Sequence, residues 1–198
     1  DVNVQTLNCD FFLFSAHKMY GPTGLGVLWG RKELLEKLPP YRFGGEMIRK
    51  VSVTGTTFND LPFKYEAGTP NIEAVIGFNE SISFCKEVGR ADMHKHELQL
   101  LKLATEELRK IEGSTIYADL ENKVGVLSFN VEGIHSADIG TLLDQQGVAV
   151  RTGHHCTQPL WEKLGTTGSV RASFACYNTI EDVEIFIAAL NKSVNMLR

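Results

Sequence analysis

The chain has 198 residues, of which 43% are hydrophobic and 22% are charged, and its formal net charge is −4. This composition predicts a globular protein with a sizeable core, and no apolar run approaches the roughly 18 residues that span a bilayer. The acidic balance excludes the positive electrostatic footprint of a nucleic-acid binder. Four widely spaced cysteines favour a reducing, cytoplasmic compartment over a disulfide scaffold.

The beginning of the chain carries no signal peptide, and its first residue is Asp1. We therefore expect a fragment or a processed chain. Two short apolar runs, residues 10–14 and 25–29, are typical of strands covered on both faces, with a polar turn between them.

The next segment, residues 31–38, predicts a short helix that ends before Pro39 and Pro40. Residues 41–65 show neither helical nor strand periodicity, which predicts a long loop. A helical pattern then runs from Asn71, a candidate N-cap, to residue 88. Gly89 interrupts it, and residues 91–111 continue as a second helix, so we place the domain boundary near this glycine.

Beyond that boundary, strand-like and helical segments alternate, which predicts an α/β unit. The expected strands are residues 114–117, 124–131, 148–151 and 170–175. Residues 136–146 predict a helix ended by Gly147, and residues 153–168 predict a loop. Thr179 and Asp182 form a capping-box signature that opens the last helix.

Lys18 lies four residues after the first apolar run and before a glycine-containing turn. A desolvated amine there would have a lowered pKa and could form a Schiff base with a carbonyl, although a lysine after a strand is more often a solvated loop residue. Ser15 and His17 lie two residues apart, so in an extended segment they would face the same way. Their hydroxyl and imidazole groups would suit a phosphate.

The segment from Arg151 to Cys156 leaves an expected strand and places one thiol beside His154, His155 and a guanidinium. Positive neighbours favour the thiolate, so Cys156 is a candidate reactive thiol, the alternative being a buried structural cysteine. A metal site is disfavoured because adjacent residues reach one ion poorly and no second ligand cluster has zinc spacing.

Arg171 stands in an otherwise small and apolar strand, where its guanidinium suits a bidentate carboxylate partner. The alternative is an exposed arginine at a sheet edge. Thr69 precedes an expected helix, so its hydroxyl and nearby backbone N–H groups could bind an anion. The alternative there is simple capping by Asn71.

Four motifs occur together in one order along the chain, and they are Ser15-Ala16-His17-Lys18, Glu66-Ala67-Gly68-Thr69-Pro70-Asn71, Arg151-Thr152-Gly153-His154-His155-Cys156 and Arg171-Ala172-Ser173. In this combination the chain resembles the cysteine desulfurases of the SufS-like group II and the selenocysteine lyases. These are pyridoxal-phosphate (PLP) enzymes of the class V aminotransferase superfamily, with fold type I. The resemblance runs from end to end of the chain.

The resemblance implies that Lys18 binds PLP as a Schiff base, with Ser15 and His17 on the cofactor phosphate. Thr69 would reach the phosphate bound by the neighbouring subunit of a homodimer. Cys156 would be the nucleophile on a mobile loop. Substrate binding would fall to Arg171, which would anchor the substrate carboxylate, and to Arg151, with His154 and His155 tuning the loop.

The implied activity is conversion of L-cysteine to L-alanine, with a persulfide left on Cys156 for iron-sulfur cluster assembly. Selenocysteine lyase is the neighbouring alternative, because both reactions need a thiol loop and a carboxylate anchor. A non-catalytic module that docks an acceptor protein or a second copy is the alternative from another class.

The resemblance also implies a fold and a domain division. Residues 1–85 would be the end of a PLP-binding large domain with a mostly parallel sheet, and residues 86–198 a small carboxyl-terminal α/β domain with the cysteine loop. The family's carboxylate partner of the pyridine nitrogen and its ring-stacking histidine are not in the chain. We therefore expect the carboxyl-terminal part of a desulfurase, which alone binds PLP poorly and turns over little.

The acceptor of the persulfide sulfur is expected to be another protein. Relatives that use a zinc-containing, SufU-like acceptor share a histidine just before the aspartate that follows the 124–131 strand. Here Ala137 precedes Asp138, which favours a SufE-like acceptor.

Overall fold

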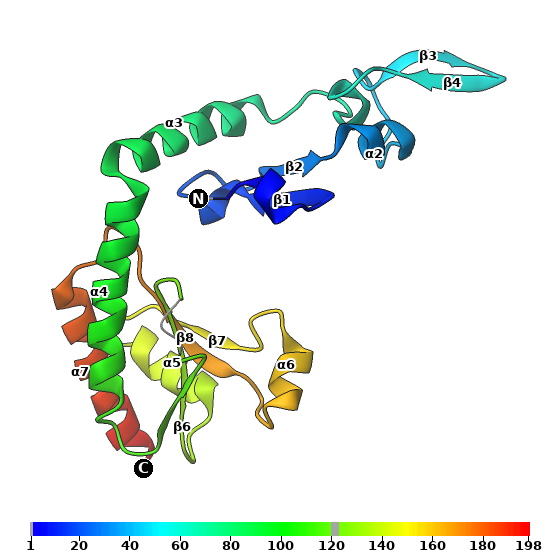
Figure 1. The fold of residues 1–198 in the computed structure, drawn as a ribbon. Coiled ribbons are helices and arrows are strands. Elements are labelled where there is room, and N and C mark those ends of the chain that lie inside the picture. The colour runs from blue at the N-terminus through cyan, green and yellow to red at the C-terminus, as the bar shows by residue number, and fades with distance from the viewer. Residues whose placement is uncertain (1, 120–122) are drawn as a thin grey trace. The chain divides into compact units, whose positions relative to one another are not determined.

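The computed structural model describes residues 2–119 and 123–198, and Figure 1 shows the succession of their helices and strands. The chain divides into two compact units, Asp1–Glu87 and Val88–Arg198. None of the helices in the described residues combines the length and the apolar character that crossing a membrane requires.

The first unit begins with a short helix, α1 (Val4–Leu7), followed by an antiparallel hairpin of β1 (Phe11–Ser15) and β2 (Gly26–Gly30). Both strands were expected, but the expectation that both faces are covered is wrong for this unit. Phe14 packs against Phe78 on one face, whereas Leu13 on the other is 68% exposed. An apolar run reports which side chains a strand carries, and only the tertiary structure decides what covers them.

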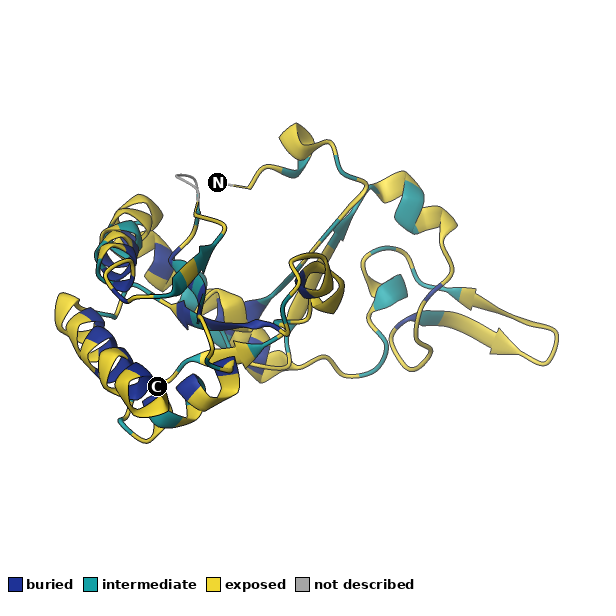
Figure 2. Ribbon diagram, turned by 90° about the horizontal axis from the view of Figure 1, so that it is seen from below, coloured by how far each residue is buried: buried dark blue, intermediate teal, exposed yellow. Residues whose placement is uncertain are grey.

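The segment 41–65 is not the plain loop that its lack of periodicity predicts. After α2 (Lys32–Lys37), it forms an antiparallel hairpin of β3 (Ile48–Ser52) and β4 (Gly55–Phe58), then a single 3₁₀ turn, η2 (Phe63–Tyr65). This hairpin is almost entirely exposed (Figure 2). Because neither face is buried and the register shifts between Ile48 and Lys50, no apolar alternation marks these strands in the sequence.

Two long helices, α3 (Ile72–Val88) and α4 (Arg90–Leu108), confirm the predicted pair and its break. The Asn71 side-chain oxygen accepts a hydrogen bond from the backbone N–H of Ala74 at 3.2 Å, as expected of an N-cap. Gly89 separates the helices with a φ of +88°, a conformation that glycine adopts without steric cost.

The second unit contains a four-stranded sheet in the order β5-β6-β8-β7. Its strands are β5 (Ser114–Tyr117), β6 (Val126–Val131), β8 (Ser169–Ser173) and β7 (Arg151–Gly153). Every strand pair in the described part of both units is antiparallel. The mostly parallel sheet expected for the first part of the chain is therefore not formed by these residues.

One face of this sheet is packed against helices α4, α5 (Ser136–Asp144) and α7 (Ile180–Leu197). In β6 every second residue, Leu127, Phe129 and Val131, is buried in that core, so the strand follows a period of two. Burial of each such side chain contributes about 1.5–3 kcal/mol. The capping box of α7 is confirmed, with Thr179 and Asp182 bonded reciprocally.

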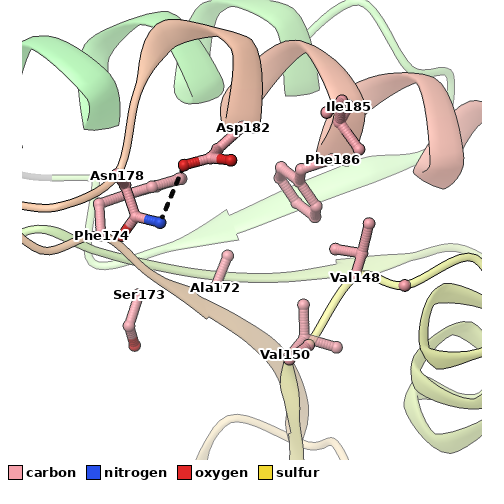
Figure 3. Close-up of a pocket in the computed structure, with 11 residues that line it drawn as sticks. Val148, Val150, Ala172, Ser173, Phe174, Asn178, Asp182, Ile185 and Phe186 are labelled. Carbon is pink, nitrogen blue, oxygen red and sulfur yellow. Dashed lines mark hydrogen bonds between the residues drawn. The ribbon is translucent and has the colours of Figure 1, made fainter.

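The strand predicted at residues 148–151 begins later in the chain, as β7 at Arg151–Gly153. Residues 148–150 form no strand pair with β8, and they line, with residues of β8 and α7, a pocket of about 220 Å³ in which Ile185 and Phe186 of α7 face Val148 and Val150 (Figure 3). None of the candidate catalytic or binding residues lines this pocket. The expected loop at 153–168 also contains a short helix, α6 (Gln158–Lys163).

Candidate active site

Cys156 lies at the apex of a tight turn after β7. The His154 carbonyl oxygen accepts hydrogen bonds from the Thr157 backbone N–H at 2.9 Å and from the Thr157 hydroxyl at 2.9 Å. Between them, His155 and Cys156 have φ values of +51° and +63°. Residues other than glycine are destabilised by about 1–2 kcal/mol each in this left-handed region. The turn therefore holds an exposed thiol in a strained backbone.

A glycine pair closes the loop that carries this turn. Gly153 and Gly168 have φ values of +103° and +120°, and a Cβ on Gly168 would lie 2.5 Å from the carbonyl atoms of Gly153. Asn130 of β6 donates from its side-chain amide to the Gly168 carbonyl oxygen at 2.8 Å. Only glycine fits at Gly168, because any side chain there would overlap the opposite backbone.

His155 is pinned to the first residue of β8. Its Nε2 lies 3.1 Å from the Ser169 carbonyl oxygen and 3.0 Å from the Ser169 hydroxyl. Because a carbonyl oxygen only accepts, Nε2 carries the hydrogen in this contact. Burial, and then the charges of Arg171 and Arg151, lower the pKa of His155. The positive charge beside the cysteine turn therefore comes from the arginines rather than from this imidazole.

Arg151 and Arg171 stand directly opposite each other on β7 and β8. Like charges in directly opposed positions destabilise a sheet. The Nε of Arg171 is also buried, and it has no hydrogen-bond partner among the described residues. A buried unpaired donor is costly, so this pair of guanidinium groups is suited to an anion such as a carboxylate.

Three candidate residues of the first unit lie at the end of β1 and in the turn after it. Ser15 ends that strand, and residues 16–18 form a single 3₁₀ turn, η1 (Ala16–Lys18). The argument that Ser15 and His17 face the same way in an extended segment is therefore wrong, because the strand ends between them. His17 and Lys18 are exposed, so this unit does not supply the desolvated surroundings expected for the amine.

Thr69 is exposed just before α3, and Asn71 performs the capping there. His154 is exposed as well, and its backbone carbonyl rather than its ring organises the turn. The described residues contain no group of three or more acidic, histidine or cysteine side chains that could hold a metal ion.

Sequence reasoning missed the polar and aromatic residues behind the turn, namely Tyr117, Asn130, Trp161, Thr166 and Ser169. Trp161 is 4% exposed although it lies in an expected loop, and its indole N–H donates to the His154 carbonyl oxygen at 2.7 Å. A tryptophan in an expected loop was the one signal available in the sequence.

The fold and this site together define an α/β protein that presents a strained cysteine turn beside a pair of arginines. Residues 1–186 match the model of the family described as aminotransferase class-V. The chain belongs to this family.

Similar proteins carry a more specific name. The chain is 47% identical over 196 residues to a probable cysteine desulfurase of Xylella fastidiosa, covering 99% of this chain and 47% of the relative. The crystal structure of the cysteine desulfurase CsdA of Escherichia coli matches with a TM-score of 0.93 at 40% identity, over 98% of this chain and 48% of the other.

An apo structure of a cysteine desulfurase from Thermococcus onnurineus matches with a TM-score of 0.92, also at 40% identity, over 98% of this chain and 49% of that one. The chain thus spans about half the length of the relatives it matches.

Proposed function

We propose that this chain is part of a PLP-dependent cysteine desulfurase that converts L-cysteine to L-alanine and leaves a persulfide on Cys156. The observation that carries the proposal is the exposed Cys156 in a turn whose neighbour, His155, lies in the field of Arg151 and Arg171. A nucleophilic thiol beside an anion-binding pair is what sulfur transfer from an amino acid requires.

Substrate binding is assigned to the arginine pair. The unpaired Nε of Arg171 gives a carboxylate a ready hydrogen-bond donor, and Arg151 opposite adds a second positive charge. The substrate carboxylate would relieve both the repulsion between the two guanidinium groups and the unmet hydrogen bond. His154 and His155 would border this site and position the loop.

The residues at the end of β1 and in the turn after it fit the chemistry of PLP. Ser15, His17 and Lys18 offer a hydroxyl, an imidazole and an amine within four positions, and these groups bind a phosphate and a carbonyl carbon. Lys18 would hold the cofactor and move a proton at the substrate α-carbon, and Ser15 and His17 would bind the phosphate. When bound, PLP withdraws electrons from the substrate and makes its carbon–sulfur bond labile.

Cys156 performs the sulfur transfer in this proposal. Its thiolate forms a bond to the substrate sulfur while the carbon–sulfur bond breaks, and the carbon skeleton keeps the electron pair, gains a proton and leaves as alanine. The balance is one cysteine plus one thiol giving one alanine plus one persulfide, so no external oxidant is needed.

The domain roles complete the proposal. Residues 1–85 would belong to the PLP-binding large domain, and residues 86–198 would form the small domain with the cysteine loop. In a homodimer, Thr69 would contact the cofactor phosphate bound by the partner subunit. Because the chain spans about half the length of its relatives, we expect it to bind little PLP by itself.

A chimaera tests the proposed activity. This chain replaces the matching residues of the Xylella relative, and alanine formation from L-cysteine is measured together with persulfide on Cys156 by mass spectrometry. We expect activity that Lys18→Ala and Cys156→Ser abolish and that the matched control Cys176→Ser retains. A folded, PLP-binding chimaera that forms no alanine while the intact relative does would refute the proposal.

Thiol labelling of the 198-residue chain tests the cysteine separately. A desulfurase predicts that iodoacetamide labels Cys156 faster than the partly buried Cys176, whereas a docking module predicts comparable rates. Comparing L-selenocysteine with L-cysteine in the Cys156→Ser chimaera then separates a selenocysteine lyase from a desulfurase. Turnover of selenocysteine alone in that variant would favour the lyase.

The acceptor is proposed to be SufE-like and to work in the cytoplasm in iron-sulfur cluster assembly. Ala137, in the first turn of α5, offers no imidazole before Asp138, and it only donates its backbone N–H to the ring of His135 at 3.2 Å. Stimulation of the chimaera by a zinc-containing acceptor and not by a SufE-like one would overturn this assignment.

A further inference from the structure

The loop that carries Cys156 is stabilised by contacts between its own residues. Its two ends meet at Gly153 and Gly168, and between them Trp161 is buried while His155 and Thr166 are partly buried. The close approach of its two ends is the closure typical of an Ω-loop, and here the loop also contains α6. The residue at its centre is Trp161, which is 4% exposed.

Trp161 makes three contacts that together connect the cysteine turn to the sheet. Its indole N–H donates to the His154 carbonyl oxygen at 2.7 Å. Its ring meets the Tyr117 ring edge-on with centroids 5.1 Å apart and the His155 ring at 5.8 Å. Since Tyr117 belongs to β5, Trp161 connects the cysteine turn to a strand of the sheet.

The His154 carbonyl oxygen is the acceptor that keeps the turn closed. It accepts from the Thr157 N–H and hydroxyl as well as from Trp161, while His155 and Cys156 are held in left-handed conformations. Without these donors, both residues would relax toward negative φ values and the thiol would change direction. The strain at Cys156 therefore needs an external support.

We propose that Trp161 is a positioning residue that holds the Cys156 turn closed through the His154 carbonyl oxygen. The proposal rests on the assignment of Cys156 as the sulfur-accepting nucleophile. It adds to that assignment a residue that acts on the thiol through the His154 carbonyl oxygen and determines where the thiol points.

The test uses the 198-residue chain and hydrogen exchange at the Thr157 amide. Trp161→Phe keeps the ring contacts and removes the donor, and we expect exchange about tenfold faster, as for the loss of one hydrogen bond. Trp29→Phe, at the chain's other tryptophan, is the matched control and leaves the rate unchanged. An unchanged rate in Trp161→Phe overturns the proposal.

Rescue distinguishes support of a strained turn from general packing. Because glycine accepts a positive φ without strain, adding Cys156→Gly to Trp161→Phe should return the Thr157 exchange rate to within about threefold of the unmodified chain. Adding Cys156→Ala should not. Equal rates in the two double variants would contradict the role of the turn.

The consequence for sulfur transfer is measured in the chimaera. Trp161→Phe should lower the rate of Cys156 persulfide formation about tenfold and leave the KM for L-cysteine unchanged, since the arginine pair is untouched. A raised KM with an unchanged rate would overturn the positioning role. Hydrogen exchange requires no turnover, so failure of the proposed activity leaves the exchange result standing, and the two failures are distinguishable.

Discussion

Gly168→Ala tests whether the two ends of the cysteine loop meet as closely as the structure has them. A Cβ at this position would lie 2.5 Å from the Gly153 carbonyl carbon and oxygen, where only backbone is available to move. The φ of +120° is also closed to alanine. Strain of this kind costs about 1–3 kcal/mol and overpacking a further 1–3 kcal/mol, so we expect a loss of about 3–4 kcal/mol of unfolding free energy.

The measurement is urea unfolding followed by tryptophan fluorescence in a Trp29→Phe background, where Trp161 is the reporter in the second unit. Gly165→Ala is the matched control, since its φ is +71° but nothing lies within 4 Å of the added Cβ. Backbone strain alone should then cost about 1 kcal/mol. Equal destabilisation by the two variants would refute the close contact between Gly153 and Gly168.

Three further outcomes are expected. Arg171→Met removes a buried unpaired donor and the repulsion from Arg151, so the unfolding free energy in urea should rise by about 1 kcal/mol at low salt, and a fall would contradict the unmet hydrogen bond. The hydrogen bond from the Thr179 backbone N–H is the main cause that lowers the pKa of Asp182. The stability that the Asp182 carboxylate provides is therefore present above its ordinary pKa of 3.8 and is lost as the pH falls through the pKa of the folded chain. In thermal unfolding, the Asp182→Ala chain should lose less stability on acidification than the unmodified chain. Burial, and then Arg171, lower the pKa of His155, so the folded loop binds fewer protons than the unfolded loop. Protection of the Thr157 amide from hydrogen exchange, corrected for intrinsic exchange, should therefore be full above the ordinary pKa of 6.5 and should weaken as the pH falls below it. A His155→Gln chain should lack this pH dependence.

The sequence was sufficient to predict features that depend only on residues adjacent in the chain. Gly89 separates two helices and Thr179 opens the last one as the sequence indicated, because caps and positive φ values depend on a few adjacent residues. The position of Arg171 in a strand followed in the same way from its small, apolar neighbours.

Predictions failed where the answer depends on distant residues. The exposed β3–β4 hairpin lacks an apolar alternation, and β7 begins later than its apolar residues suggested because residues 148–150 form no strand pair with β8. The 3₁₀ turn after Ser15 likewise overturned an argument that assumed an extended backbone.

By itself, the sequence determined the residue types available for chemistry and their order along the chain, since a motif needs only its own letters. The tertiary structure alone decided that Arg151 faces Arg171, that His155 is bonded to Ser169, and that Trp161 supports the cysteine turn. These contacts join residues on separate strands and loops. Their formation depends on strand register and side-chain packing, which no local pattern specifies.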